Sequence, residues 1–138
     1  MCYYICMKSG GIMGINEINI ISLAYLGDAV YELKVRDYLI STGISKVNKL
    51  QKEAMNFVTA KNQAKYINYF IDNNLLTDEE TDYAKRGRNA SVYSHPKNTD
   101  IVTYKWATGF ESLFGFLYLN HNNERINELF NIILEVKE

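Results

Sequence analysis

The chain of 138 residues contains a single proline, Pro96, so long stretches can be helical without interruption. It has no uninterrupted apolar run of the roughly 20 residues that a membrane span requires; Asp28 and Glu111 are among the charged residues that cut the longest candidates. Cysteine is confined to Cys2 and Cys6, with no later partner at a zinc-site spacing. These features predict a cytoplasmic all-α protein with reduced thiols and no membrane association.

The chain also lacks a large net charge of either sign. Fifteen Lys and Arg face sixteen Asp and Glu, which excludes a polybasic tail, and a hydrophobic content of 47% excludes a disordered chain. The length suits one domain. The first residues carry neither the basic region nor the small-residue cleavage site of a signal peptide. We therefore expect a poorly ordered leader over 1–15 and one domain over 16–138.

Apolar residues recur at steps of three and four, which is the helical period. Ser45 is the expected N-cap of the second helix, Thr77 and Glu80 match a capping box, and Asp100 lies at the start of a core helix that includes Val102. Residues 89–99 have the composition of an exposed loop. The predicted helices cover about 19–39, 45–59, 61–73, 77–88, 100–119 and 124–137.

Two of these helices combine a carboxylate with glycine in their most apolar part. Gly27-Asp28-Ala29 lies in the first, and Gly109-Phe110-Glu111, followed by Gly115, lies in the fifth. Glycine inside a helix costs roughly 0.5–1 kcal/mol relative to alanine, which indicates a close approach to the backbone. A buried carboxylate must be protonated, paired or bound to metal. If the helices pack together, Asp28 and Glu111 form an oxygen-rich site of the kind that Mg²⁺ prefers.

A simpler interpretation places both acids on solvated helix faces, or pairs them with a cation such as Lys34, Arg36 or Lys105. The pattern alone favours that interpretation, and for Glu32, one turn after Asp28, it favours a surface role.

Positive charge gathers between residues 85 and 105, where Asp100 is the single acid. Such a segment is either a solvated loop or a surface for phosphate oxygens, to which Ser91, Tyr93, Ser94 and Asn98 would add neutral hydrogen-bonding groups. His95 and His121 have no catalytic partner at motif spacing, so we interpret them as surface or turn residues. The cations of the segment are Lys85, Arg86, Arg88, Lys97 and Lys105.

Four stretches, in order, resemble the ribonuclease III domain family, in the form of its small Mini-ribonuclease III group. They are Leu23-Ala24-Tyr25-Leu26-Gly27-Asp28-Ala29-Val30-Tyr31-Glu32, Val58-Thr59-Ala60-Lys61-Asn62-Gln63-Ala64-Lys65, Lys85-Arg86-Gly87-Arg88-Asn89-Ala90, and Pro96-Lys97-Asn98-Thr99-Asp100 continuing to Gly115. The similarity runs from about Asn16 to the C-terminus.

The resemblance implies an all-α ribonuclease III-like endonuclease that cleaves double-stranded RNA and leaves 5′-phosphate and 3′-hydroxyl ends. It implies a homodimer that uses Mg²⁺, with Mn²⁺ as a substitute, and acts in 23S ribosomal RNA maturation, where a ribosomal protein presents the RNA. The metal-binding and catalytic acids map onto Asp28 and Glu111. The first helix is expected at the dimer face, with tyrosines as anchors. The expected RNA-binding residues are Lys85, Arg86, Arg88, Asn89 and Lys97, with Lys61 and Lys65 as weaker candidates.

The chain departs from the larger enzymes of the family in two ways. Ala24 and Thr108 occupy positions where the larger enzymes carry further acids, and in this respect the chain resembles the small group. Fewer side chains can then bind the metal directly, so more water should complete the metal shell. The appended RNA-binding domain is absent, so binding should depend steeply on salt. The alternative function is a catalytically inactive RNA-binding or ribosome-associated scaffold, which would be expected to lose the carboxylates. A helical protein-interaction module would show no RNA affinity.

Overall fold

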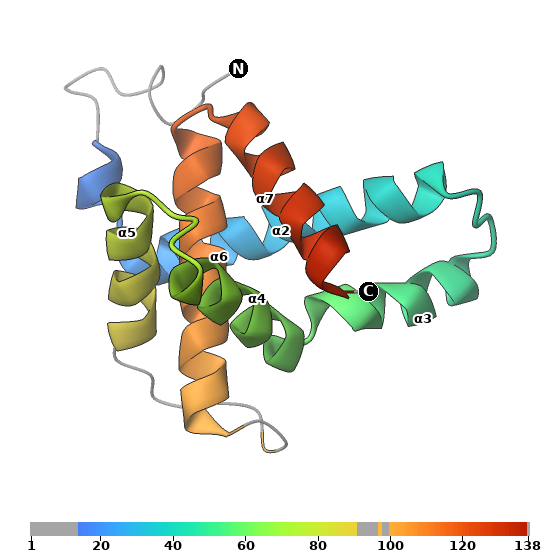
Figure 1. The fold of residues 1–138 in the computed structure, drawn as a ribbon, viewed down its shortest axis with the longest axis horizontal. Helices are drawn as coiled ribbons and strands as arrows, with labels where there is room; N and C mark the ends of the chain where they lie inside the picture. The colour runs from blue at the N-terminus through green and yellow to red at the C-terminus, as the bar shows by residue number, and fades with distance from the viewer. Residues whose placement is uncertain (1–13, 91–96, 98–99, 138) are drawn as a thin grey trace.

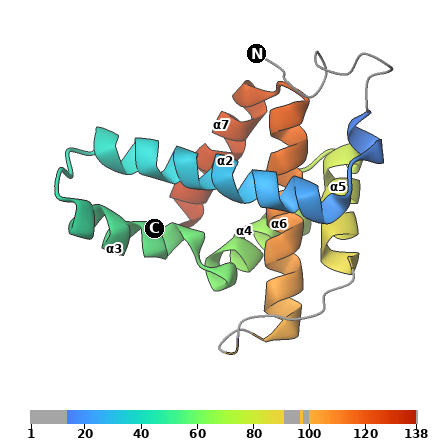
Figure 2. The same ribbon diagram turned by 180° about the vertical axis from the view of Figure 1, so that it is seen from behind.

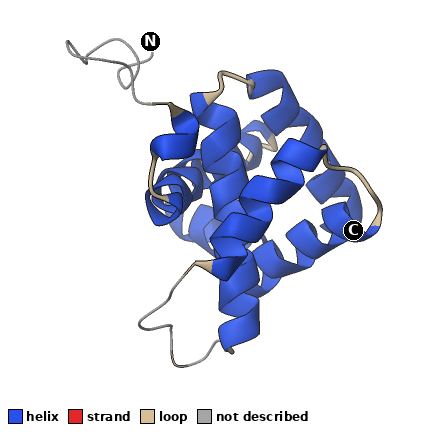
Figure 3. Cartoon of the chain, turned by 90° about the vertical axis from the view of Figure 1, so that its left-hand side faces the viewer, coloured by secondary structure: helices blue, strands red, loops and turns tan. Residues whose placement is uncertain are grey.

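The computed structural model describes residues 14–90, 97 and 100–137. All the regular structure in these residues is helical, which confirms the all-α prediction (Figure 3). Apart from residues 14 and 15, the expected leader lies outside the described part, as does most of the expected loop. The elements are η1 (Ile15–Glu17), α2 (Ile20–Ser41), α3 (Val47–Val58), α4 (Ala60–Asp72), α5 (Asp78–Asn89), α6 (Ile101–Leu119) and α7 (Asn123–Lys137).

Helix α6 is the centre of the fold, and α2, α4 and α5 all pack against it (Figure 1). Helix α2 crosses α6 on the side nearest the viewer in Figure 2, and α5 runs beside α6 in the opposite direction. From Ala107 to Leu117 every residue of α6 except Glu111 is buried. A helix with neighbours on several sides has no polar face, as its sequence already indicates.

Local hydrogen bonds set most helix boundaries where the sequence predicts them. The Asn19 side chain accepts from the Ile21 amide at the start of α2, and Asp100 accepts from the Thr103 amide at the start of α6. Thr59 both ends α3 and caps α4. The capping box that opens α5 is also present: the Thr77 hydroxyl accepts from the Glu80 amide, and the Glu80 carboxylate accepts from the Thr77 amide. These bonds satisfy backbone donors that have no partner inside a helix.

Two sequence predictions are wrong. The N-cap of α3 is Lys46 rather than Ser45, and no side chain caps that helix end. Val102 does not belong to the core, because 61% of its surface is exposed. It lies in the first turn of α6, which projects beyond the neighbouring helices and so leaves its side chains in solvent (Figure 1). The burial of α6 begins only at Ala107.

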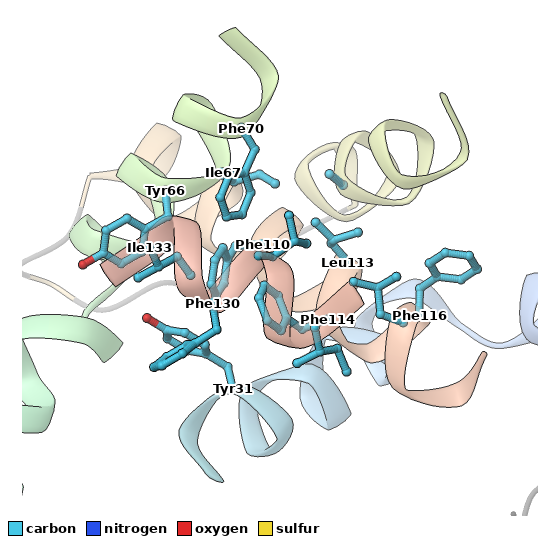
Figure 4. Close-up of a cluster of buried hydrophobic side chains, with 14 of the residues drawn as sticks. Tyr31, Tyr66, Ile67, Phe70, Phe110, Leu113, Phe114, Phe116, Phe130 and Ile133 are labelled. Atoms are coloured by element: carbon cyan, nitrogen blue, oxygen red, sulfur yellow. The ribbon is translucent and has the colours of Figure 1, made fainter. Parts of the chain in front are cut away.

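Aromatic side chains from three helices fill the core around Tyr31 (Figure 4). Its ring lies 4.7 Å from that of Phe110, 5.5 Å from that of Phe114 and 6.3 Å from that of Phe130, all edge-on. The buried Tyr31 hydroxyl donates to the Phe57 carbonyl at 3.0 Å, which satisfies the one polar atom of the ring. Tyr31 thereby fixes the middle of α2 against α6.

The tyrosines outside the first helix differ in burial. Tyr66 is buried, and its hydroxyl donates to the Asn56 carbonyl. Tyr69 and Tyr118 are partly exposed. None of the described helices has the length and apolar character needed to span a membrane.

Candidate active site

Glycines bring the backbones of α2 and α6 into contact where the two helices cross. A Cβ atom at Gly27 would overlap the Glu111 carbonyl oxygen, and one at Gly115 would overlap the Leu23 carbonyl oxygen. Both positions therefore exclude every larger residue at this separation. The sequence-based inference that something approaches these glycines is confirmed: the approaching group is the backbone of the other helix.

This crossing brings Asp28 and Glu111 together, one from each helix. Glu111 is partly buried, and its pKa is raised to about 9, first by burial and then by the charge of Asp28. The Glu111 carboxyl group also donates a hydrogen bond to Asp28, which favours its protonated form. Asp28 itself is exposed. The site thus has one carboxylate open to solvent and a second held behind it.

Gln63 completes the site from α4, and the sequence analysis did not single it out. Its side chain is only 2% exposed and donates a hydrogen bond to Glu111, which acts to lower the pKa of that carboxyl group. A signal for its burial was present in the sequence. Gln63 precedes Ile67 by four residues and Phe70 by seven, so all three share one helix face.

The donor set fits a hard divalent cation. Two carboxyl groups that meet without a cation force one of them to keep a proton, and a bound Mg²⁺ would remove that conflict. One turn before Asp28 and Glu111 on their helices lie Ala24 and Thr108, which are buried and neutral. No cluster of three His, Cys, Asp or Glu side chains occurs in the described residues. Asp28 and Glu111 would therefore hold the ion with water in the remaining positions, as is usual for Mg²⁺.

Helix α5, which carries Lys85, Arg86, Arg88 and Asn89, packs against α6 at Gly109, two residues before Glu111. A Cβ at Gly109 would lie 2.5 Å from the Ala84 carbonyl oxygen, so glycine again permits close packing, here between α5 and α6. Arg88 lies with its guanidinium 4.6 Å from the centre of the Trp106 ring and donates to the Asn89 side chain at 2.9 Å. Arg86 lies 4.8 Å from the centre of the Tyr83 ring. These contacts restrict both side chains before any ligand binds.

The charges of these residues are available to a ligand. Lys85 and Lys97 are exposed, and within the described part of the chain no carboxylate lies within 4.0 Å of the charged groups of Lys85, Arg86, Arg88 or Lys97. His95 lies outside the described residues.

Helix α4 holds its lysines away from the carboxylates. Lys61 and Lys65 are exposed and stand two residues on either side of Gln63. At about 100° per residue, each lies on the side of the helix opposite the Gln63 side chain. The structure therefore brings Gln63, but not these two cations, to the carboxylates.

The remaining polar residues of the sequence analysis have local roles. Glu32 is paired with Arg36 at 3.5 Å, the surface role expected for it. His121 is exposed in the turn after α6, where its φ of 58° lies in the left-handed region.

Comparison with known proteins gives consistent similarities. The Ribonuclease III domain family matches residues 21–122. A protein named Mini-ribonuclease 3 from Enterococcus faecalis is 47% identical over 115 residues, which are 83% of this chain and 87% of that protein. Its namesake from Streptococcus pneumoniae is 43% identical over 118 residues, covering 86% and 92%. A crystal structure of a Fusobacterium nucleatum protein superposes with a TM-score of 0.79 at 31% identity, covering 88% of this chain and 97% of that one.

Proposed function

The chain belongs to the ribonuclease III family of endoribonucleases, and we propose that it is an Mg²⁺-dependent enzyme that cleaves double-stranded RNA at Asp28 and Glu111. The meeting of these two carboxyl groups at the glycine crossing of α2 and α6 is the observation that carries this proposal. The family resemblance adds the substrate class, and the basic end of α5 adds a surface that suits its phosphates.

The two acids have different tasks. Asp28 is exposed and so could reach an ion at the protein surface, whereas the partly buried Glu111 would hold the ion from the protein side. When bound there, Mg²⁺ supplies positive charge next to the scissile phosphate and makes water a stronger nucleophile at neutral pH. The rigid helix crossing fixes the separation of the two carboxylates, so little reorganisation is needed when substrate binds.

Hydrolysis forms a bond from a water oxygen to phosphorus and breaks the bond from phosphorus to O3′. The products are a 5′-phosphate and a 3′-hydroxyl, whose oxygen takes up a proton. Arg86 and Arg88, already held against aromatic rings, bind backbone phosphates on either side, and Lys85, Asn89 and Lys97 extend that surface. Lys61 and Lys65 would contact only RNA that reaches the far side of α4. Contacts to phosphates fix the position of the duplex but carry no sequence information.

An exposed apolar stripe on α2 suits a second copy of the chain. Ile21, Tyr25 and Leu33 share the solvent side of the helix, where Tyr25 is 85% and Leu33 is 71% exposed. Tyr25 stands one turn before Asp28, so a symmetric dimer through this stripe would place the two sites near each other. Each subunit would then cut one strand of the duplex.

The substrate that we propose is a 23S ribosomal RNA precursor in the cytoplasm, presented with the help of a ribosomal protein. The alternative is a catalytically inactive RNA-binding or ribosome-associated scaffold. Such a scaffold has no need for two acids held against each other at a helix crossing, since their repulsion disfavours the ionised site.

The test is a cleavage assay with a long duplex RNA and its single-stranded counterpart, in Mg²⁺ or in EDTA, with wild type and Glu111→Gln side by side. We expect cleavage of the duplex alone, only with Mg²⁺, and its loss in Glu111→Gln. Duplex binding without cleavage in wild type would favour the scaffold, and no binding of duplex RNA at low salt would favour a protein-interaction module.

A further inference from the structure

Four polar or charged side chains are buried among the described residues, and three of them have structural roles. Glu80 completes the capping box of α5 and pairs with Arg125. The Thr108 hydroxyl donates to the Tyr104 carbonyl, and the Ser112 hydroxyl donates to the Thr108 carbonyl, both one turn back along α6. The fourth is Gln63, whose hydrogen bond runs from α4 to the Glu111 side chain.

Gln63 serves no helix end. It lies in the first turn of α4, where the cap is already supplied by the Thr59 hydroxyl, which accepts from the Asn62 amide. The backbone N–H of Gln63 also has a partner, since it donates a hydrogen bond to the Thr59 carbonyl at 2.9 Å. No buried side-chain nitrogen or oxygen in the described residues lacks a partner. The Gln63 carboxamide therefore takes no part in capping α4, and its hydrogen bond runs to the Glu111 side chain.

A carboxamide suits this position for a chemical reason. Its NH₂ group donates to a carboxylate oxygen but carries no charge, so it holds Glu111 without neutralising it or competing with a cation. A lysine or arginine there would neutralise the acid, and a further acid would add repulsion. Partners of this kind fix the orientation of metal ligands, and their loss typically lowers metal affinity or activity by 10–100-fold.

We propose that Gln63 is a positioning residue that holds the Glu111 carboxylate in the orientation needed to bind the divalent ion together with Asp28. This inference rests on the metal site of the proposed function. It adds a third helix to the site: α2 and α6 supply the ligands, and α4 orients one of them.

The test compares Gln63→Met, which keeps the length of the side chain but removes the donor, with Ser112→Ala as the matched control. Ser112→Ala also removes a buried polar group next to Glu111, but one that bonds only to backbone carbonyls. Two quantities are measured on the full chain: the rise in Tm caused by Mg²⁺ in the absence of RNA, and the Mg²⁺ concentration that gives half-maximal cleavage.

For Gln63→Met we expect a smaller Mg²⁺-induced rise in Tm and a half-saturating Mg²⁺ concentration about 10–100-fold higher, with cleavage recovering at high Mg²⁺. Ser112→Ala should lower Tm without changing either Mg²⁺ response. Equal Mg²⁺ responses in wild type and Gln63→Met, or a wild-type Tm that does not respond to Mg²⁺, would overturn the inference.

A second variant, Gln63→Glu, keeps the inference testable if Gln63→Met does not fold. It places a third carboxylate beside the two acids, so Mg²⁺ should raise its Tm by more than it raises that of wild type; an unchanged response would count against the positioning role. The Tm measurements need no RNA. If wild type failed to cleave duplex RNA while Gln63→Met still weakened the Mg²⁺ response, the proposed function would fall and the positioning role would stand.

Discussion

The raised pKa of Glu111 predicts how the free energy of unfolding depends on pH. In the unfolded chain this carboxyl group titrates near its ordinary pKa of 4.5, whereas in the folded protein without metal its pKa is about 9. Between these values the folded state holds a proton that the unfolded state has released. The free energy of unfolding must therefore fall as pH rises across this window, and Mg²⁺, which replaces the proton, should reduce the slope.

The size of the effect follows from the linkage relation. One pH unit corresponds to about 1.4 kcal/mol per proton, which sets a limit of about 2.7 kcal/mol between pH 6 and pH 8. Water at the exposed Asp28 screens part of the interaction, so we expect a loss of about 1–2 kcal/mol. Glu111→Gln carries no titrating proton at this position, and its stability should lack this contribution.

The assay is urea unfolding at pH 6, 7 and 8 in EDTA, for wild type and Glu111→Gln, repeated with Mg²⁺. The difference between the free energies of unfolding of the two proteins at each pH removes the titration of all other groups, because those groups are common to both. If the two stability profiles ran parallel, or if wild type gained stability over the variant as pH rose, then Glu111 would not be protonated in the metal-free fold and the reasoning would be refuted.

Four further substitutions test other parts of the structure. Arg88→Ala should weaken binding of duplex RNA and lower the slope of log K against log salt by about 1, and Lys65→Ala should have less effect in the same gel-shift titration. Gly27→Ala should destabilise the fold by about 3 kcal/mol or prevent folding, because its Cβ would overlap the backbone of α6; a stable variant by circular dichroism would contradict the close crossing. Arg125→Met should cost about 3 kcal/mol in urea unfolding by leaving the buried Glu80 carboxylate unpaired, and a loss below about 1 kcal/mol would mean that the pair contributes little.

The helices were predictable from sequence because their signals are local. The apolar period located each of the six α-helices, and the signals at Thr77 and Asp100 marked where two of them begin. The N-cap of α3 was not predictable in this way. That helix starts at Lys46 without a side-chain bond, so packing rather than capping sets its first residue. Val102 has the correct period for the core, but no sequence pattern shows how far α6 projects beyond its neighbours.

The site was predictable in part. Glycine next to an acid in two apolar helices indicated a close approach, and the family motifs indicated that the acids were Asp28 and Glu111. Their adjacency depends on how α2 and α6 cross, which is a tertiary property. Gln63 was missed because glutamine in a helix is usually a surface residue, and only its step of four to Ile67 placed it on the core face.

The glycines and the acids of this site depend on the same close crossing of α2 and α6. Gly27 and Gly115 cost helical stability at two core positions, and the contact that they permit brings two like charges together, which is a second cost. A protein selected only for stability would gain from a wider crossing with alanine at both glycines and a neutral residue in place of Glu111. A divalent cation bound there, as we propose, would offset this repulsion, because both carboxylates could then bind the same ion. The crossing therefore has the features expected of a metal-binding site, where stability is given up for function.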